Sequence, residues 1–585
     1  MKKDSLITET EIFYEMGINN PSKPRLMIKS ESGWQPVTWG EILDCATKIS
    51  FYFSNIDVGL NTKVAIFAKN QVEWAYFDVA IHAVRGVFVP VYTSNTPDQV
   101  KYIVNHSDAE VIVTELERLP VLFKIWKELS LVRRVIIVDF ENEDNLLKML
   151  EKFVINTGMA LTFAEIKNKV VSLKEIYQQD TTLKKDNSQG LKSFIDEIQP
   201  SDISTILYTS GTTGEPKGVV LTRYHLHTNS EDWINVLGNL IPETRVDLLW
   251  LPMSHIFGWG ELGLGNTLNF TTYLTTPIEV LNDMPSVKPT IFMSVPTYWE
   301  KLYLSAKAFS NQKAQQISQL HALTGGRLKF CLSGGAGLKG EIKRFFYEAG
   351  LLIIEGYGLT ECSPTLTMNR KNSFDFHSVG KPFPKVQLKL VGDGEILVKG
   401  RSIFKEYYKN PQATAEAFDN DGWFKTGDLG ELTDRGFLKI KGRKKEIIVT
   451  LGGKNISPQL IETQFKNDPY IEHIVLYGNE RKYLTALITL NKENVIHYAT
   501  QMQIAYKDYS ALVQNPRIRV HIQKIIDKVN KNLASFETIK KFLIHDGHLT
   551  VETGFLTPSL KLKRNFVYEA FKDQLDTLYK EEQSF

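Results

Sequence analysis

Cysteine is scarce in this chain of 585 residues, which contains only Cys45, Cys331 and Cys362. These three are odd in number, lie far apart and lack a Cys-x-x-Cys spacing. Neither a disulfide framework nor a zinc cluster is therefore predicted. The scarcity favours a reducing compartment, and we expect the protein to be cytoplasmic.

An excess of charge of one sign is also missing. Lysine and arginine total 69, aspartate and glutamate total 67, and the formal net charge is +2. Such a balance creates no long-range field that would recruit nucleic acid or anionic lipid. We therefore predict no nucleic-acid partner, while a local basic patch stays compatible with the composition.

Long hydrophobic runs are absent as well. The first residues carry lysines followed by acidic side chains rather than an apolar region, so no signal peptide is predicted. No uncharged apolar stretch reaches the roughly 20 residues of a membrane-spanning helix. Membrane contact is expected only as peripheral contact on the cytoplasmic face, an alternative that the sequence leaves open.

The chain contains alternating strand-like and helical patterns instead. Its length and its 43% of apolar residues allow several packed units. In the first part of the chain we predict buried strands at 64–67, 87–92, 111–113 and 135–138, and helices at 73–84 and 97–106. This alternation is typical of an α/β fold. The more polar residues 141–200 are expected to form connecting helices or a surface excursion.

Further strands are predicted at 247–251, 290–293 and 328–332. Each ends at a loop with glycine or proline, where ligands usually bind. From residue 394 onward, short strands and turns predict a small β-rich subdomain.

We place a domain boundary at residues 443–445, near the end of the β-rich region. The predicted fold class is α/β, with a large multi-lobed N-terminal α/β domain of residues 1–443 and a small α+β C-terminal domain of residues 444–585. In the latter we expect strands at 474–476 and 484–490 and an amphipathic helical stretch at 518–539.

The most informative segment is residues 208–221, a loop rich in glycine and hydroxyl side chains between two apolar runs. Glycines allow backbone N–H groups to face an anion, hydroxyls add donors and Lys217 adds a positive charge. The P-loop of NTPases would instead place Gly-Lys-Ser/Thr at the start of a helix. We predict an ATP phosphate site of another kind, formed by Thr209, Ser210, Gly211, Thr212, Thr213, Gly214 and Lys217.

A second segment, residues 356–361, combines three kinds of chemistry. The ring of Tyr357 is suited to stack on adenine, Thr360 to donate to a phosphate oxygen, and Glu361 to bind Mg²⁺ through a hard oxygen. An ordinary turn at the end of a strand would not bring these groups together within so few residues.

Several other segments are weak signals when each is taken alone. Residues 333–337 and 451–458 also fit ordinary tight turns, and residues 556–564 fit an exposed lysine-rich tail. A single histidine such as His255 is more often a core residue than a catalytic one.

In their order along the chain, these motifs resemble those of the adenylate-forming superfamily, which includes acyl-CoA synthetases, firefly luciferase and the adenylation domains of peptide synthetases. The resemblance extends from about residue 32 to residue 564. Residues 421–445 are similar to the signature of fatty acyl-CoA synthetases, and Leu560 agrees with the long-chain branch. Lys425, the pair 431–432 and Gly442 depart from that signature, which weakens any inference about chain length.

The resemblance implies a role for each matching residue. It assigns Glu361 to Mg²⁺, Asp428 to the ribose hydroxyls, and Lys561 to catalysis of adenylate formation. Lys445 falls at the hinge of a mobile C-terminal domain. The residues implied in binding the nucleotide or the pantetheine channel of coenzyme A are Gly335, Ala336, Tyr357, Gly358, Thr360, Arg443, Gly452 and Gly453.

The resemblance also makes His255 a wall of the carboxylate pocket, grouped with the catalytic residues Lys561, Glu361, Thr209 and Lys217. Its apolar neighbours are candidates for lining an acyl tunnel: Phe257, Trp259, Leu262 and Leu264. An apolar stripe of this kind fits ordinary core equally well.

The implied activity is ATP-dependent conversion of a long-chain fatty acid to acyl-CoA through an acyl-adenylate, with release of AMP and pyrophosphate. Fatty acid, ATP, Mg²⁺ and coenzyme A are then the small molecules bound, and no oligomeric state is predicted. Three alternatives stay open: transfer to acyl carrier protein, action on medium-chain or aryl acids, and a binder without catalysis.

Overall fold

Two large sheets form the bulk of the protein, in a computed structural model that describes residues 8–140, 142–178, 187–209, 215–466, 468–557 and 561–580. The first sheet has eight strands, mostly parallel. In spatial order they are β19 (Glu406–Tyr407), β9 (Lys217–Thr222), β8 (Ile203–Thr209), β4 (Val87–Pro90), β3 (Lys63–Phe67), β5 (Ala109–Thr114), β6 (Arg134–Ile137) and β7 (Val170–Ser172).

The second sheet has nine strands, with a parallel centre and antiparallel edges. Its order is β16 (Lys381–Pro382), β15 (Thr365–Met368), β14 (Ile353–Gly358), β13 (Phe330–Ser333), β12 (Ile291–Ser294), β10 (Val246–Leu249), β11 (Thr271–Leu274), β1 (Pro24–Ser30) and β2 (Gly33–Thr38).

Helices fill the space between and around these sheets. One continuous hydrophobic core joins both sheets to helices that include α2 (Trp39–Asn55), α3 (Glu73–Ala83) and α11 (Ile256–Leu268). A second core covers the eight-stranded sheet with α4 (Pro97–His106), α5 (Leu119–Ile125) and α6 (Glu143–Thr157). The predicted α/β architecture is confirmed, and α4 begins with a capping box formed by Thr96 and Gln99.

A four-stranded antiparallel sheet follows the two large ones and matches the predicted β-rich subdomain. It consists of β17 (Val386–Val391), β18 (Glu395–Gly400), β20 (Phe424–Leu432) and β21 (Leu438–Arg443). The pairing of β20 with β21 sets Asp428 opposite Arg443.

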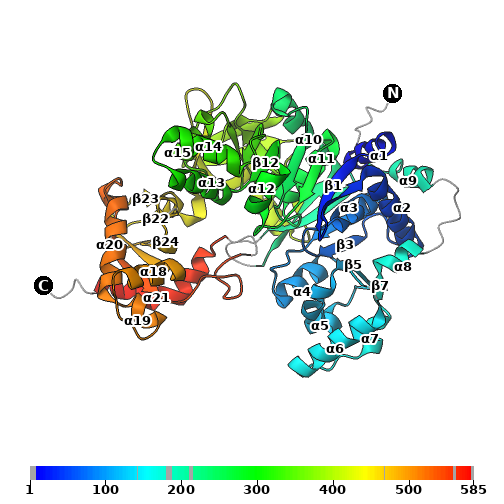
Figure 1. Ribbon diagram of the computed structural model, residues 1–585, viewed down its shortest axis with the longest axis horizontal. Coiled ribbons are helices and arrows are strands. Elements are labelled where there is room, and N and C mark those ends of the chain that lie inside the picture. Colours follow the sequence, from blue (N-terminus) through cyan, green and yellow to red (C-terminus); the bar gives the residue numbers. More distant parts are fainter. Residues whose placement is uncertain are drawn as a thin grey trace.

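The C-terminal elements, orange to red in Figure 1, gather to one side of the larger body. Their sheet contains β24 (Ile471–Tyr477), β25 (Leu484–Leu490) and β26 (Ile539–His545), with β25 and β26 parallel. The helices of this part are α17 (Pro458–Glu462), α18 (Lys492–Gln501), α19 (Tyr509–Val513), α20 (Pro516–Asn530) and α21 (Arg564–Lys580).

The helical stretch predicted at 518–539 is too long. Helix α20 has the expected amphipathic stripe of Ile518, Ile522 and Ile526, but it ends at Asn530. The Asn530 side chain donates to the carbonyl of Ile539 at 2.9 Å and accepts from its N–H at 3.0 Å, where β26 begins. This contact between residues nine apart in the sequence lies where the helix ends. The periodicity of apolar residues alone does not predict such a contact.

The polar region 141–200 contains mostly helices, as expected. These are α6, α7 (Phe163–Lys167), α8 (Leu173–Gln178) and α9 (Asn187–Ile195). The short strand β7 was not predicted, and it forms an edge of the eight-stranded sheet by pairing with β6.

Helix α11 is anchored to the nine-stranded sheet by buried charged groups. Arg25 of β1 is fully buried and donates to the Asn266 side chain and to the Leu262 carbonyl, both at 2.8 Å. The carboxyl groups of Asp247 and Glu261 lie in the same cluster. Burial, together with the neighbouring Asp247, raises the pKa of Glu261 well above its usual value.

Replacing Glu261 with glutamine is expected to leave the protein as stable as the parent at pH 5 and more stable at pH 8. A carboxyl group with a higher pKa in the folded protein loses its stabilising contribution as the pH rises from its unfolded pKa, near 4.5. Glutamine mimics the protonated acid and removes this loss. Thermal unfolding at both pH values measures the effect, and a larger gain at pH 5 than at pH 8 would contradict the assignment.

Candidate active site

A large cleft of about 2780 Å³ is lined by both the N-terminal body and the C-terminal elements. Strand ends and the loops after them supply several of its polar groups, and helices supply others. Thirteen of the predicted site residues line it: Thr209, Lys217, His255, Gly335, Ala336, Tyr357, Gly358, Thr360, Glu361, Asp428, Arg443, Lys445 and Lys561. Their roles remain predictions, but the structure brings them into one space.

Asp428, Tyr357 and Arg443 form one hydrogen-bonded group in this cleft. The Tyr357 hydroxyl donates to Asp428 Oδ2 at 2.6 Å, and Arg443 Nε lies 2.8 Å from Oδ1. Burial raises the pKa of Asp428, while Arg443 and Tyr357 lower it. Each carboxylate oxygen has more than one acceptor position, so Asp428 keeps the capacity to accept from a vicinal diol.

Glu361 lies beside this group, in the short 3₁₀ turn of residues Thr360–Cys362. Its Oε1 accepts a hydrogen bond from the Tyr407 hydroxyl at 2.9 Å. In the described ranges, no cluster of three or more histidine, cysteine, aspartate or glutamate side chains is arranged to hold a metal. One carboxylate still fits Mg²⁺, which takes most other ligands from phosphates and water.

The predicted phosphate loop is described at its two ends. Thr209 ends β8 and Lys217 begins β9, so these antiparallel strands enter and leave the loop. The Lys217 ammonium lies 4.9 Å from the centre of the Tyr407 ring. Ser210, Gly211, Thr212, Thr213 and Gly214 lie outside the described residues.

The predicted adenine loop follows β13. Gly335 has a φ of 82°, a left-handed conformation that favours glycine. Glu355 of β14 supports this loop, because its Oε1 accepts from the Leu338 N–H at 2.9 Å and it forms a buried ion pair with Lys343. Gly358 also requires glycine, since a Cβ there would lie 1.9 Å from the Pro364 carbonyl oxygen.

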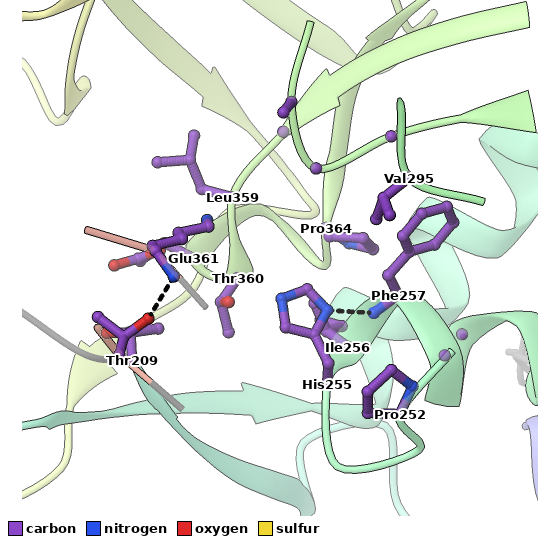
Figure 2. A pocket seen from close by; sticks show the side chains of 18 of the residues that line it. Thr209, Pro252, His255, Ile256, Phe257, Val295, Leu359, Thr360, Glu361 and Pro364 are labelled. Atoms are coloured by element: carbon purple, nitrogen blue, oxygen red, sulfur yellow. Dashed lines mark hydrogen bonds between the residues drawn. The ribbon is translucent and has the colours of Figure 1, made fainter. Parts of the chain in front are cut away.

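His255 caps the N-terminus of α11 and faces the cleft (Figure 2). Its Nδ1 accepts from the Phe257 N–H at 3.1 Å, and Phe257 and Val295 lie nearby in Figure 2. Burial and the charge of Lys561 lower the pKa of His255 to about 4. The ring is therefore neutral near pH 7, with Nε2–H available to donate, which suits orientation of a carboxylate.

Three of the four expected tunnel residues line the cleft, and their place in a tunnel stays a prediction. Phe257, Trp259 and Leu264 line the cleft. Leu262 does not line the cleft, because its side chain is buried in the core. Its carbonyl accepts a hydrogen bond from Arg25.

Residues 556–557 pair antiparallel with residues 561–562, and Lys561 reaches the cleft from this pairing, which is called the Lys561 hairpin below. The Thr557 N–H donates to the Lys561 carbonyl at 2.7 Å, and the Lys561 N–H donates to Thr557 Oγ1 at 3.0 Å. Lys561 lies among many protein atoms yet contacts the solvent of the cleft. Desolvation and Arg443 lower its pKa, while Asp428 and Glu361 raise it.

The base of this hairpin is fixed by an ion pair that the sequence did not reveal. Arg564, three residues after Lys561, makes contacts of 2.6 and 2.7 Å with the two carboxylate oxygens of Glu462. A bidentate pair of this kind holds geometry well. Tyr407 was missed for the same reason, because its partners Glu361 and Lys217 lie far from it in the sequence.

Two groups of predicted residues lie at the boundary with the C-terminal part. Lys445 belongs to the 3₁₀ turn of residues Lys444–Glu446, directly after β21. Gly452 and Gly453 are exposed in the turn between β22 (Ile448–Val449) and β23 (Asn455–Ile456), and they do not line the cleft. Across the described ranges, no helix has the length and apolarity to cross a membrane.

Comparison with known families gives two matches. Residues 18–408 match the AMP-binding enzyme family, and residues 445–583 match the AMP-binding enzyme C-terminal domain.

Curated relatives match over nearly the whole chain. A long-chain-fatty-acid–CoA ligase of Mycobacterium bovis is 31% identical over 94% of this chain and 93% of its own length. The peroxisomal long chain acyl-CoA synthetase 6 of Arabidopsis thaliana is 30% identical over 93% of this chain and 82% of its own.

Solved structures share the fold at lower identity. The adenylation domain of a carboxylate reductase from Mycobacterium chelonae has a TM-score of 0.77 and 21% identity, covering 99% of this chain and 92% of that one. An anthranilate CoA ligase in complex with anthranoyl-AMP has a TM-score of 0.72 and 20% identity, with 97% of both chains covered.

Proposed function

The chain belongs to the AMP-binding enzyme family, and on this basis we propose that it is a long-chain fatty acid–CoA ligase that forms AMP. One observation carries the proposal beyond family membership. Lys561, Glu361, Asp428 and His255 line the same cleft although they come from four separate segments. That set supplies a cation, a metal ligand, a ribose acceptor and a carboxylate donor.

In the first half-reaction, the fatty acid carboxylate attacks the α-phosphorus of ATP. A bond forms between the carboxylate oxygen and that phosphorus, the bond to the bridging oxygen breaks, and pyrophosphate leaves. His255 orients the carboxylate, and Asp428 holds the ribose. Lys561 lies between two approaching anions and stabilises the charge that builds up there.

Mg²⁺ bound with the nucleotide would supply charge neutralisation at the phosphates. Among the residues of this chain, Glu361 offers the carboxylate for it and Lys217 the second positive charge. Residues 210–214 complete the phosphate loop in this proposal.

In the second half-reaction, the thiol of coenzyme A attacks the acyl carbonyl of the adenylate, and AMP leaves. The proposal includes rotation of residues 444–585 about Lys445, which withdraws Lys561 and brings Gly452 and Gly453 to the cleft. Their present position outside the cleft is compatible with the first half-reaction.

A product assay with Mg·ATP, coenzyme A and acids of increasing chain length tests this function. We expect acyl-CoA and AMP, formed fastest from long-chain acids. Acyl-AMP that accumulates with coenzyme A but is consumed by acyl carrier protein would identify the other acceptor. Preference for medium-chain or aryl acids would replace the substrate class, and no pyrophosphate from any acid would exclude the ligase.

A further inference from the structure

Tyr407 occupies an unusual place between two groups that face the proposed phosphate site. It lies on the two-residue strand β19, which pairs antiparallel with β9 so that Tyr407 is opposite Val219. Strand β9 begins at Lys217, at the end of the phosphate loop. Tyr407 is only 9% exposed, so its ring is held by its surroundings.

The two ends of this side chain contact different partners. Its hydroxyl donates to Glu361 Oε1 at 2.9 Å. The face of its ring lies under the Lys217 ammonium, 4.9 Å from the ring centre, within the range of a cation–π contact. The ring of Phe404 packs against it, with 4.7 Å between centroids.

Among the residues that the structure describes, the Tyr407 hydroxyl is the one group that donates a hydrogen bond to the Glu361 carboxylate. The Glu361 backbone carbonyl accepts from the Phe404 N–H at 2.7 Å, which fixes the main chain but not the carboxylate. The Tyr407 hydroxyl occupies one carboxylate oxygen, and within the described ranges the other oxygen accepts no hydrogen bond. A carboxylate held in this way binds better to a cation that requires strict coordination geometry than a freely rotating carboxylate does.

We propose that Tyr407 is a positioning residue that sets the Glu361 carboxylate and the Lys217 ammonium at a fixed separation for a metal-bound nucleotide polyphosphate. This inference rests on the proposed function, because it assigns both groups to Mg·ATP. The hydroxyl positions Glu361, the proposed metal ligand, and the ring positions Lys217. The two contributions are therefore separable by substitution.

Tyr407→Phe removes the hydroxyl and keeps the ring. We expect the Mg²⁺ concentration for half-maximal rate to rise about tenfold, as for loss of one hydrogen bond to a charged group. The rate at saturating Mg²⁺ should stay within about threefold of the parent, because the carboxylate itself remains. Isothermal titration calorimetry with ATP should show weaker binding in Mg²⁺ and unchanged binding in EDTA.

Tyr407→Leu removes both contacts. Its affinity for ATP should fall in EDTA as well as in Mg²⁺, because Lys217 loses the ring beneath it. A double variant tests the route through the carboxylate: Tyr407→Phe combined with Glu361→Gln should lose no more Mg²⁺-dependent ATP affinity than Glu361→Gln alone.

The neighbouring tyrosine provides a matched control. The Tyr408 hydroxyl donates to Asp108 Oδ2 at 2.9 Å, away from Glu361. Tyr408→Phe should leave the Mg²⁺ response unchanged, and thermal unfolding should show that all variants fold. An unshifted Mg²⁺ response in Tyr407→Phe, an equal shift in Tyr408→Phe, or additive losses in the double variant would overturn the inference.

Failure of this inference can be told apart from failure of the proposed function. If the parent releases no pyrophosphate from any acid, the ligase assignment fails. The calorimetric comparison of Mg·ATP with ATP in EDTA still reports on Tyr407 in that case, because it requires no acid and no turnover.

Discussion

Replacing Lys561 with alanine is expected to lower the rate of acyl-adenylate formation by about 10²- to 10³-fold, in the range found when one transition-state donor is removed. Thioester formation from supplied acyl-AMP and coenzyme A should stay close to the parental rate. The reason is that Lys561 lines the same cleft as Asp428, Glu361 and Arg443, at the proposed nucleotide site, and is close enough for their charges to shift its pKa. The second half-reaction is proposed to proceed with the hairpin withdrawn.

The two half-reactions are measured separately, the first by acid-dependent exchange of pyrophosphate into ATP and the second with synthetic acyl-AMP. Lys572→Ala is the matched control, because Lys572 lies on α21 of the same C-terminal part, is 61% exposed and pairs with Asp576. Equal loss in both halves for Lys561→Ala would refute this division of labour.

Replacing Asp428 with asparagine is expected to lower kcat/KM for ATP by about 10²- to 10³-fold, as for two charge-assisted hydrogen bonds. Asp428 is 4% exposed, and its neighbours Arg443 and Tyr357 are arranged around a carboxylate. Asparagine has the same shape but no charge, and its NH₂ group cannot accept from a ribose hydroxyl. The loss should appear mainly in KM for ATP, with KM for the fatty acid little changed.

Asp421→Asn is the control for this prediction, since Asp421 lies in the same subdomain with an exposed side chain. A further comparison uses 2′-deoxy-ATP. The parent should discriminate against the deoxynucleotide, and Asp428→Asn should do so much less. Unchanged discrimination would show that Asp428 does not contact the ribose.

The sequence was sufficient to predict the groups whose chemistry is local. Glu361 and Tyr357 stand within one short motif, and Lys217 stands in a loop whose composition already indicates anion binding. The alternation of strands and helices predicted seven strands of the two large sheets, which are β3, β4, β5, β6, β10, β12 and β13, because buried parallel strands are short apolar runs. Such features depend on neighbours along the chain.

The contacts that fix those groups were not predictable in the same way. Tyr407 acts through a strand of two residues, too short for any periodic pattern, and its partner strand β9 is far away in sequence. The Arg564–Glu462 pair and the end of α20 likewise depend on tertiary contacts. Leu262 is buried on the core side of α11, where its carbonyl accepts from Arg25 of β1, a strand far away in sequence.

The ion pair between Arg564 and Glu462 has a consequence for the proposed rotation of the C-terminal part. Both residues belong to the C-terminal part: Arg564 lies at the base of the Lys561 hairpin and Glu462 at the end of α17. The ion pair therefore ties the hairpin to another element of the same part. A segment tied in this way would move with the rest of the C-terminal part as one rigid unit. In the proposed rotation about Lys445, the Lys561 amine would therefore leave the cleft together with the rest of the C-terminal part, with the Arg564–Glu462 pair intact.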